Sequence, residues 1–412
     1  MSTIMIVSGE SSGELYGSLL ARALKNKWPD VHIIGIGGQR MSEAGVELIS
    51  QISDAFGIFK AIASLRKLKA AFDNAVEALR KFRPDVLVLI DYPDFNLKVA
   101  KEAKSLGIKV LYYVSPQVWA WRKGRVKKIA SLVDKMAVLL PFEEKIYKDA
   151  GLPCEFVGHP ILEEIEAEIT SLVDRHKSSE KSTVPSSAVQ AGLISPGLRT
   201  VAKSALGLDP DRPLLSLLPG SRPHELRRLL PLMIEVVRQM KKDPDILREN
   251  KEYQFCMPLA PNTDEQKYGT FLDALKKEGV HIRKGESVRV LAASDLAVVA
   301  SGTATLQTAF LEVPMVVVYK ISPLEFQIGK RIIDVKHISL ANILAGRDVV
   351  VELLQRDANP GEVMKELKKI ILDEKYRDNM ISHFKEIKRP FSGKKTSQRV
   401  ADIILEMVIW RK

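Results

Sequence analysis

A short acidic loop in this sequence could supply a general base. The loop Asp91-Tyr92-Pro93-Asp94-Phe95-Asn96 directly follows the run 86–90, which is continuously apolar, as buried parallel strands are. A carboxylate at the carboxyl end of such a strand lies where burial can tune its pKa for proton abstraction. We therefore predict Asp91 as the base, and we expect Asp94 or Asn96 to cap the following helix.

Three turns made of small residues could bind an anionic group. They span 9–14, 220–222 and 300–303, and each comes between an apolar run and a helical pattern. Small residues let a backbone approach a ligand closely, and a helix N-terminus offers free N–H groups to phosphate. Arg222 adds a guanidinium that can hold phosphate through two hydrogen bonds, and Gln307, further into the last helix, could reach a ribose hydroxyl. An ordinary turn without a ligand is the alternative for the first and the last of these turns.

The first turn also matches G-x-S-x-G, the nucleophile elbow of serine hydrolases, with Ser11 as the nucleophile. We discount this interpretation, because an elbow needs an oxyanion loop from an earlier strand and only eight residues precede Gly9. The turn 220–222 lacks the G-x-x-x-x-G-K-[ST] pattern, which excludes a P-loop.

An aromatic and basic loop follows the apolar run 110–114. Trp119 and Trp121 are two of the four tryptophans in the chain, and Arg122 opens a series of basic residues up to 128. Tryptophans in a loop are costly unless they pack or bind something, so the loop favours an anionic partner. A solvated basic face is the alternative.

A long amphipathic segment spans 57–83. Its apolar residues recur at helical spacing and are Ile58, Ile62, Leu65, Leu68, Phe72, Val76 and Leu79. Basic residues are interleaved and outnumber the acidic Asp73 and Glu77, and Phe59 adds a further apolar side chain. Packing on a core explains the stripe. A helix lying on anionic lipid explains both the stripe and the charge, and both interpretations stay open.

The elements that would position these loops form two α/β domains. A single core stops growing at roughly 250–300 residues, and this chain has 412. Short apolar runs at 4–7, 31–36, 86–90, 110–114 and 136–139 alternate with helical patterns, and the same rhythm returns at 214–218, 254–257, 280–282, 296–300 and 315–319. This alternation predicts parallel sheets in two Rossmann-like, doubly wound domains that face a cleft.

We place the N-terminal domain at 1–165 and the C-terminal domain at 205–380. The serine-rich segment 166–204 lacks sustained periodicity, so we interpret it as an insertion or linker. The tail 381–412 reads as helical and basic, and we expect it to pack back on the N-terminal domain.

Composition limits the function classes. The 62 Lys and Arg exceed the 51 Asp and Glu by 11, which favours anionic partners, namely nucleic acid, phosphorylated metabolites or an anionic membrane surface, without choosing among them. Two cysteines, far apart and without metal-type spacing, exclude a disulfide framework and indicate a reducing cytosol. No apolar run approaches the roughly 20 residues of a membrane span. We expect neither a metal nor a cofactor.

Taken together, these loops resemble lipid-A-disaccharide synthases, glycosyltransferases of the two-Rossmann-domain (GT-B) type. The resemblance covers nearly the whole chain except 166–204 and rests on motifs in order: Gly9-Glu10-Ser11-Ser12-Gly13, Arg83-Pro84-Asp85, Asp91 to Asn96, Tyr113-Val114-Ser115-Pro116, Val118-Trp119-Ala120-Trp121-Arg122, Leu140-Pro141-Phe142-Glu143, Phe156-Val157-Gly158-His159, Leu218-Pro219-Gly220-Ser221-Arg222, Ala300-Ser301-Gly302-Thr303-Ala304 and Asn342 to Arg347.

The resemblance implies a reaction and a set of roles. The family joins UDP-2,3-diacylglucosamine to 2,3-diacylglucosamine 1-phosphate without a metal, with inversion at the anomeric carbon, releasing UDP. Catalysis would fall to Asp91 and Glu10. The UDP-sugar would be held by Gly13, Ser221, Arg222, Ser301, Gly302, Thr303, Gln307 and Asn342. The acceptor and lipid would contact Asn96, Trp119, Arg122, Phe59, Ile62, Leu65 and Leu68.

The same resemblance implies a cytoplasmic protein held peripherally on the inner face of the inner membrane, with no nucleic acid as partner and a homodimer left open. The chain departs from the family pattern at Gln307, Glu14 and Ala341, where the family usually has Glu, Asp and Pro. Gln307 can still hydrogen-bond a ribose, but without a charge.

Two rival functions remain. A UDP-N-acetylglucosamine 2-epimerase uses the same kind of domain pair, but it would need neither the lipid-facing helix nor the tryptophan loop. A non-enzymatic binder of nucleic acid or anionic membrane would explain the charge alone, and it predicts no UDP binding and a steep salt dependence.

Overall fold

The computed structural model describes residues 2–9, 11–51, 62–118, 124–179, 196–249, 252–322 and 336–409. The chain divides into two compact units. Unit 1 comprises 1–160 together with 393–412, and unit 2 comprises 161–392. Each unit is built around its own parallel sheet.

The sheet of unit 1 has the strand order β3-β2-β1-β4-β5-β6-β7, and its neighbouring strands pair in parallel. The strands are β1 (Thr3–Ser8), β2 (His32–Gly37), β3 (Glu47–Gln51), β4 (Val86–Ile90), β5 (Lys109–Tyr113), β6 (Lys135–Val138) and β7 (Cys154–Phe156). The central strand β4 is buried along its whole length, which explains its unbroken apolar sequence.

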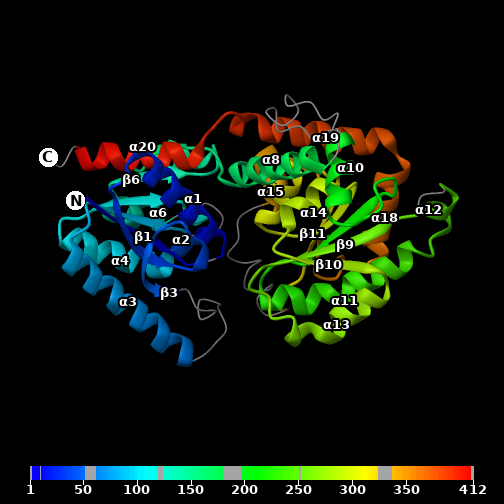
Figure 1. The fold of residues 1–412 in the computed structure, drawn as a ribbon, viewed down its shortest axis with the longest axis horizontal. Helices are drawn as coiled ribbons and strands as arrows, with labels where there is room; N and C mark the ends of the chain where they lie inside the picture. Colours follow the sequence, from blue (N-terminus) through cyan, green and yellow to red (C-terminus); the bar gives the residue numbers. More distant parts are fainter. Residues whose placement is uncertain are drawn as a thin grey trace. The chain divides into compact units, whose positions relative to one another are not determined.

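Helices cover both faces of this sheet. They are α1 (Ser11–Lys27), α2 (Gln39–Glu43), α3 (Ile62–Phe82), α4 (Pro93–Ser105), α6 (Arg125–Leu132), α7 (Glu143–Lys148) and α20 (Thr396–Ile409). Helices α1 and α20 lie side by side on one face, and α3 and α4 cover the other (Figure 1). The core under α3 and α4 includes Ala75, Leu79, Val99 and Tyr112.

The sheet of unit 2 repeats this plan with the strand order β10-β9-β8-β11-β12-β13, again in parallel. The strands are β8 (Leu214–Leu218), β9 (Gln254–Leu259), β10 (Val280–Lys284), β11 (Leu296–Ala300), β12 (Met315–Tyr319) and β13 (Glu352–Leu354). In both sheets the chain builds outward on one side and then returns to build the other. This is the doubly wound arrangement that the sequence predicts.

The helices of unit 2 are α8 (Ile161–Ser179), α10 (Pro196–Ala205), α11 (Pro223–Met240), α12 (Pro244–Arg248), α13 (Gly269–Lys277), α14 (Ser287–Ala293), α15 (Thr303–Phe310), α17 (Leu340–Ala345), α18 (Pro360–Leu372) and α19 (Glu374–Lys388). Helices α11, α13 and α18 pack together, while α8, α10 and α14 form a second group (Figure 1). Short 3₁₀ turns lie at Gln266–Tyr268 and Arg389–Phe391.

One predicted segment needs correction. The structure places helix within 166–204, because α8 continues to Ser179 and α10 begins at Pro196. In α8, Ile165, Ile169 and Leu172 recur at helical spacing and are buried. That apolar pattern stabilises the helix despite the serines that suggested a linker. Residues 180–195 lie outside the described part.

The C-terminal tail divides between the units. Helix α19 belongs to unit 2, whereas α20 packs against α1 in unit 1, so the predicted tail boundary at 381 falls inside a helix. A bidentate ion pair fixes α20, with Arg399 Nε 2.6 Å from Glu155 Oε1 and Arg399 Nη2 2.9 Å from Glu155 Oε2. Arg399 also bonds Glu406 on its own helix at 2.7 Å. Networks of this kind stabilise more than isolated surface pairs do.

Candidate active site

The predicted loops lie where each doubly wound sheet changes direction. In unit 1 this point falls between β1 and β4, and in unit 2 between β8 and β11. Open α/β sheets bind ligands outside the carboxyl ends of the strands at such points. The turns after Ser8 and Ile90 flank the first point, and the turns after Leu218 and Ala300 flank the second.

The Asp91 turn has an unusual backbone. Asp91 and Tyr92 have φ values of 51° and 41°, and both are therefore in the left-handed region. Val114 follows β5 with a φ of 70°, and it lies beside Asp91 because Ile90 pairs with Tyr113. Such residues cost on the order of 1–3 kcal/mol each and cluster at functional sites. The sheet edge around Asp91 therefore stores strain where the sequence predicts chemistry.

Gly9 makes room for this turn. A Cβ on Gly9 would lie 2.6 Å from both Cβ and Cγ of Tyr92. A side chain at position 9 would therefore displace Tyr92 and the turn that carries Asp91. The glycine after β1 thus serves the Asp91 turn directly.

Two buried donors hold the peptide carbonyl of Asp91. The Tyr112 hydroxyl donates to it at 2.6 Å, and Asn96 Nδ2 donates to it at 2.7 Å and to the Ile90 carbonyl at 3.1 Å. Both side chains are fully buried. Asn96, a predicted acceptor contact, therefore lies behind Asp91 and supports the turn.

Asp94 does not cap helix α4. The N-cap residue is Tyr92, without a side-chain hydrogen bond, and Pro93 occupies the first helical position. Asp94 forms an ion pair with Arg125, whose Nη1 lies 2.9 Å from Asp94 Oδ1. The Asp94 carboxylate is thus paired on the surface, whereas Asn96 supports the turn through its hydrogen bonds to the Ile90 and Asp91 carbonyls.

Two other residues of the first turn, Gly13 and Glu14, make packing and hydrogen-bond contacts within unit 1. A Cβ on Gly13 would lie 3.3 Å from Ile90 Cγ2 and 3.4 Å from Ser8 Cβ, so this glycine lets α1 pack closely on the strands. Glu14 Oε1 accepts a 2.8 Å hydrogen bond from the backbone N–H of Arg40. Glu10, the second predicted catalytic residue, lies outside the described residues.

In unit 2, the turn after β8 already contains a carboxylate. Glu225 Oε2 accepts hydrogen bonds at 3.1 Å from the backbone N–H groups of both Ser221 and Arg222. Gly220 has a φ of 88°, and a Cβ there would lie 2.1 Å from the same oxygen. The helix N-terminus is therefore occupied by an internal anion. The Ser221 and Arg222 side chains are exposed at this edge.

The turn after β11 is open on its backbone side. Gly302 has a φ of 152°, and a Cβ there would meet no atom within 4 Å, so a ligand can approach its backbone. The Ser301 hydroxyl donates to the Ile338 carbonyl at 3.0 Å, which ties the turn to the segment before α17. Thr303 begins α15 and is half-buried.

Asn342 belongs to a closed hydrogen-bond network. Its Nδ2 donates to Glu352 Oε1 at 2.8 Å and to the Val350 carbonyl at 2.9 Å, and its Oδ1 accepts from the N–H groups of Val349 and Val350. The side chain is fully buried. Asn342 was predicted to hold UDP, but here it joins α17 to β13.

Gln307 contacts a carboxylate from another helix. Its Nε2 donates to Glu164 Oε2 of α8 at 3.3 Å, and only 7% of Gln307 is exposed. A glutamate at position 307 would place two carboxylates together, whereas the amide supplies a donor. Gln at position 307, where the family usually has Glu, is thus compatible with the neighbouring Glu164 carboxylate.

Helix α3 packs on the core through its C-terminal half. Ala71, Ala75, Ala78 and Leu79 are buried, and Leu68, a predicted lipid contact, packs partly buried against the same core. The side chains of Ile62 and Leu65 lie outside the description, as do Phe59, Trp119 and Arg122 entirely.

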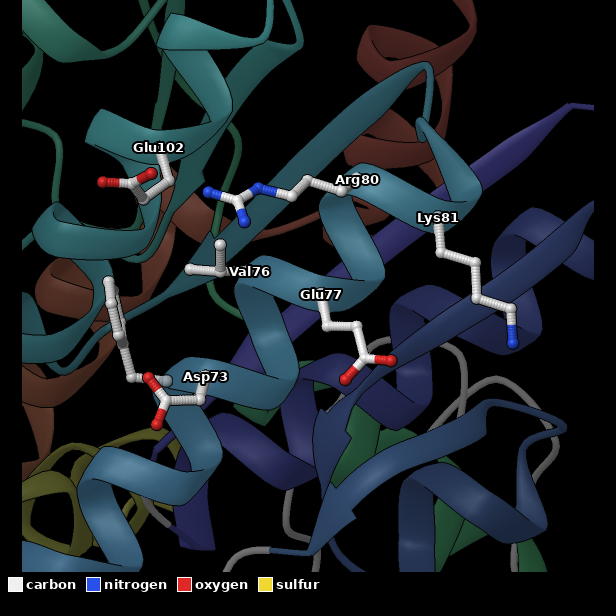
Figure 2. A pocket seen from close by; sticks show the side chains of 7 residues that line it. Asp73, Val76, Glu77, Arg80, Lys81 and Glu102 are labelled. Atoms are coloured by element: carbon white, nitrogen blue, oxygen red, sulfur yellow. The ribbon is translucent and has the colours of Figure 1, made fainter.

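A pocket of about 620 Å³ lies on α3 and α4, lined by Phe72, Asp73, Val76, Glu77, Arg80, Lys81 and Glu102. Figure 2 shows Arg80 extending from α3 toward Glu102 of α4. The walls are mixed in charge and lie along helices, away from the strand ends described above. Carboxylates in this wall make this part of α3 a poor surface for anionic lipid.

Several residues that shape these turns were not predicted, namely Tyr112, Glu164, Glu225 and Glu352. Glu225 had a sequence signal, since a glutamate three positions after an N-cap is typical of a capping box. Of the other three, Glu164 lies 143 positions from Gln307, Tyr112 lies 21 from Asp91 and Glu352 lies ten from Asn342, and no sequence pattern links these pairs. In the described part of the chain, no group of three or more His, Cys, Asp or Glu is placed to hold a metal ion. Nor does any described helix have the length and apolar character needed to cross a membrane.

A protein-family model described as lipid-A-disaccharide synthetase matches residues 4–185 and 194–404. The lipid-A-disaccharide synthase of Trichlorobacter lovleyi is 37% identical over 407 residues, which cover 98% of this chain and 97% of the relative. That of Syntrophus aciditrophicus is 40% identical over 371 residues, covering 89% and 88%. The Coxiella burnetii (strain CbuG_Q212) enzyme is 36% identical over 409 residues, covering 98% of each chain.

Solved structures show the same architecture at low identity. UDP-GlcNAc 2-epimerase from Neisseria meningitidis bound to UDP-GlcNAc superposes with a TM-score of 0.63 at 13% identity, covering 98% of this chain and 100% of that one. A UGT transferase from Siraitia grosvenorii in complex with UDP gives 0.57 at 13%, covering 99% and 100%. MurG from Acinetobacter baumannii gives 0.54 at 14%, covering 98% and 100%. These likenesses show the fold, which is of the GT-B type.

Proposed function

This chain belongs to the lipid-A-disaccharide synthase family and is a glycosyltransferase of lipid A synthesis, and from this premise we propose its substrates. The donor is UDP-2,3-diacylglucosamine and the acceptor is 2,3-diacylglucosamine 1-phosphate. The products are the β-1,6-linked disaccharide 1-phosphate and UDP. The observation that carries this proposal is the family match over both units.

Asp91 acts as the general base in this proposal. Its carboxylate takes the proton from the 6-hydroxyl of the acceptor as that oxygen bonds to the anomeric carbon of the donor. The bond from the anomeric carbon to the diphosphate oxygen breaks, and its electron pair leaves with UDP. Attack opposite the leaving group inverts the anomeric centre. The position of Asp91 at the carboxyl end of β4 and the strained turn that carries it support this role.

Glu10 remains a proposed second catalytic group. In the sequence it stands between Gly9, which accommodates Tyr92, and Ser11, where α1 begins. Its replacement by Gln is the direct test of whether it takes part in turnover.

The donor is bound by unit 2. The Arg222 guanidinium, whose Nη1 lies 3.8 Å from Glu225 Oε1, is 53% exposed at the first turn and can also pair with the diphosphate. Gly302 and Thr303 offer an open helix N-terminus at the second turn. Gln307, with Glu164 beside it, lies further along α15, where the ribose is recognised in this proposal. Because Asn342 is fully engaged by its neighbours, we assign it a supporting role.

A peripheral location on the inner face of the inner membrane fits these substrates, since their acyl chains stay in the bilayer. Helix α3 presents Arg66, Lys67 and Lys69 as exposed residues in its N-terminal half. Each basic residue near an anionic surface contributes about 1 kcal/mol. Because the pocket wall beyond Phe72 carries carboxylates and Leu68 packs against the core, we confine the proposed lipid-facing surface to residues 57–67 and Lys69.

The test is direct synthesis. Purified protein is incubated with the UDP-diacyl donor and the monosaccharide phosphate, and the products are analysed by mass spectrometry. The proposal predicts equal amounts of disaccharide 1-phosphate and UDP, and no UDP release without acceptor beyond slow hydrolysis. A parallel sample receives UDP-N-acetylglucosamine alone. Conversion to its 2-epimer, with no disaccharide in the first sample, would contradict the proposal and favour the epimerase alternative.

A further inference from the structure

The strained Asp91 turn needs an external restraint. Two consecutive residues other than glycine, Asp91 and Tyr92, hold left-handed backbone conformations. Each such residue costs on the order of 1–3 kcal/mol and persists only where its surroundings over-determine it. Position 91 must therefore be held by contacts stronger than its own conformational preference.

Tyr112 Oη and Asn96 Nδ2 provide that restraint, and we call them the Asp91 carbonyl clamp. Tyr112 Oη lies 2.6 Å and Asn96 Nδ2 lies 2.7 Å from the Asp91 carbonyl oxygen. A carbonyl oxygen has two lone pairs, so these donors satisfy it completely. They come from different elements, since Tyr112 lies on β5 and Asn96 on α4. The clamp thus fixes the Asp91 peptide plane against both neighbours.

The clamp acts on the base through the backbone. The backbone of a residue sets the direction of its Cα–Cβ bond and limits its rotamers, so a fixed peptide plane at position 91 restricts the positions that the Asp91 carboxylate can reach. Misplacing a reacting group by about 1 Å can cost on the order of 100-fold in rate. Neither clamp side chain is exposed, so neither can itself touch a substrate.

We propose that Tyr112 is a positioning residue for glycosyl transfer, which aims the Asp91 carboxylate by holding the Asp91 carbonyl. This inference rests on the proposed role of Asp91 as the base. Burial raises the pKa of Tyr112 well above its usual value, and the Asp91 charge raises it further. Tyr112 therefore keeps its proton, and the clamp its donor, at any pH where the enzyme works.

The experiment removes one hydroxyl. Tyr112→Phe keeps the ring in the core and leaves the Asp91 carbonyl one donor, Asn96. Losing one neutral hydrogen bond corresponds to about 2- to 12-fold, and the displaced carboxylate adds to it, so we expect kcat to fall about 10-fold or more. The KM values of donor and acceptor and the affinity for UDP should stay within about twofold, because no substrate contact is lost.

A matched control is available in unit 2. The Tyr376 hydroxyl also makes a 2.6 Å hydrogen bond, to Glu366 Oε1 between α18 and α19. Tyr376→Phe makes the same chemical change away from every turn described above. It should leave kcat within about twofold, whatever it does to the melting temperature.

A double-mutant cycle shows whether Tyr112 acts on the rate through Asp91 or independently of it. In an Asp91→Asn background, Tyr112→Phe should cost less than about twofold more, because the group it aims is already gone. A fully additive loss, or an unchanged kcat with a lowered melting temperature in Tyr112→Phe alone, would overturn the inference. Should Tyr112→Phe not fold, Asn96→Ser weakens the other arm of the clamp and must reproduce the same split between kcat and KM. If Asp91→Asn itself stays active, the proposed base is wrong. The kcat of this single variant shows that failure without the double mutant, so it is distinguishable from a failure of the Tyr112 proposal.

Discussion

The Glu225 carboxylate accepts a 3.1 Å hydrogen bond from the backbone N–H of Arg222, at the N-terminus of helix α11. Helix N-termini attract anions, and here the chain supplies its own. The backbone N–H groups of this turn are therefore engaged before any ligand arrives. We therefore expect the Arg222 side chain, rather than these N–H groups, to contact the donor diphosphate at this turn.

Replacing Arg222 with Ala should weaken donor binding selectively. A charge-assisted hydrogen bond is worth roughly 1.5–3 kcal/mol, so the donor KM should rise about 10- to 150-fold. Arg238→Ala is the control, because Arg238 lies near the end of the same helix and pairs with Glu278. Steady-state kinetics with each substrate varied in turn measure the effect. Equal rises in donor and acceptor KM would argue against a diphosphate contact.

Replacing Gly220 with Ala tests whether Glu225 organises the turn. The new Cβ would lie 2.1 Å from Glu225 Oε2, and the alanine would also have to adopt a φ of 88°. The carboxylate must then move, and we expect a raised donor KM together with a lower melting temperature.

Gly279→Ala separates these two effects. Gly279 has a φ of 75°, but a Cβ there would meet no atom within 4 Å. Its cost should be the backbone strain alone, about 1–2 kcal/mol of stability, with donor KM unchanged. A donor KM that rises equally in both variants would show that the turn geometry at 220 is irrelevant to binding.

We expect His159 to make the stability of unit 1 depend on pH. Burial lowers the pKa of His159 to about 3, and its ring packs edge-on against Tyr16 with centroids 5.8 Å apart. An unfolded histidine has a pKa of about 6.5, so the unfolded state binds a proton below that pH while the folded state does not. Stability from this residue is complete above about pH 6.5 and falls by roughly 1.4 kcal/mol for each pH unit toward 3.

Urea unfolding at pH 7 and pH 5 measures this dependence. His159→Phe keeps an aromatic ring against Tyr16 but has no proton to bind, so its free energy of unfolding should fall less between the two pH values. The carboxylates titrate alike in both proteins and cancel in the comparison. Identical losses in wild type and variant would mean that His159 is not the group responsible.

The basic half of α3 should bind the protein to membranes. Changing Arg66, Lys67 and Lys69 to Ala removes up to about 3 kcal/mol of attraction to an anionic surface. Flotation with vesicles containing phosphatidylglycerol should show most of the protein released. The control changes Arg248, Lys276 and Lys365, which are exposed on unit 2 and match the charge removed. Equal release by both variants would show nonspecific attraction, and no release by either would contradict the lipid-facing role of α3.

The strands could be predicted from the sequence wherever both faces of the strand are buried, because such a strand needs an unbroken run of apolar residues. Val86–Ile90 and Leu214–Leu218 appear in the structure with the bounds expected. Strands β3, β7 and β13 were missed. The residues of β3 are exposed or half-buried, and β7 and β13 have only three residues each, so none of them carries such a run. The strand-end turns followed from the strands, which is why Asp91 could be located.

What each polar side chain bonds to could not be predicted in the same way. Asn342 was expected to face a ligand, yet Glu352, ten positions on, accepts its amide. Asp91 is held by Tyr112, which lies 21 positions away and reaches it only because β4 and β5 are neighbours. The hydrogen-bond partners of a buried side chain depend on strand register and helix packing, which cannot be derived from a single sequence.

The central claim is that Asp91 is the base of glycosyl transfer, and the kcat of Asp91→Asn tests it most directly. Asparagine tolerates the left-handed conformation of position 91 and keeps the shape of the side chain, so the turn should survive the change. Asp94→Asn, at the carboxylate paired with Arg125, is the control. We predict that kcat of Asp91→Asn falls about 10²–10⁴-fold while the dissociation constant for UDP stays within about twofold. A variant that retained more than about a tenth of the wild-type rate would contradict the account, because a base worth so little is outside the range of general-base catalysis.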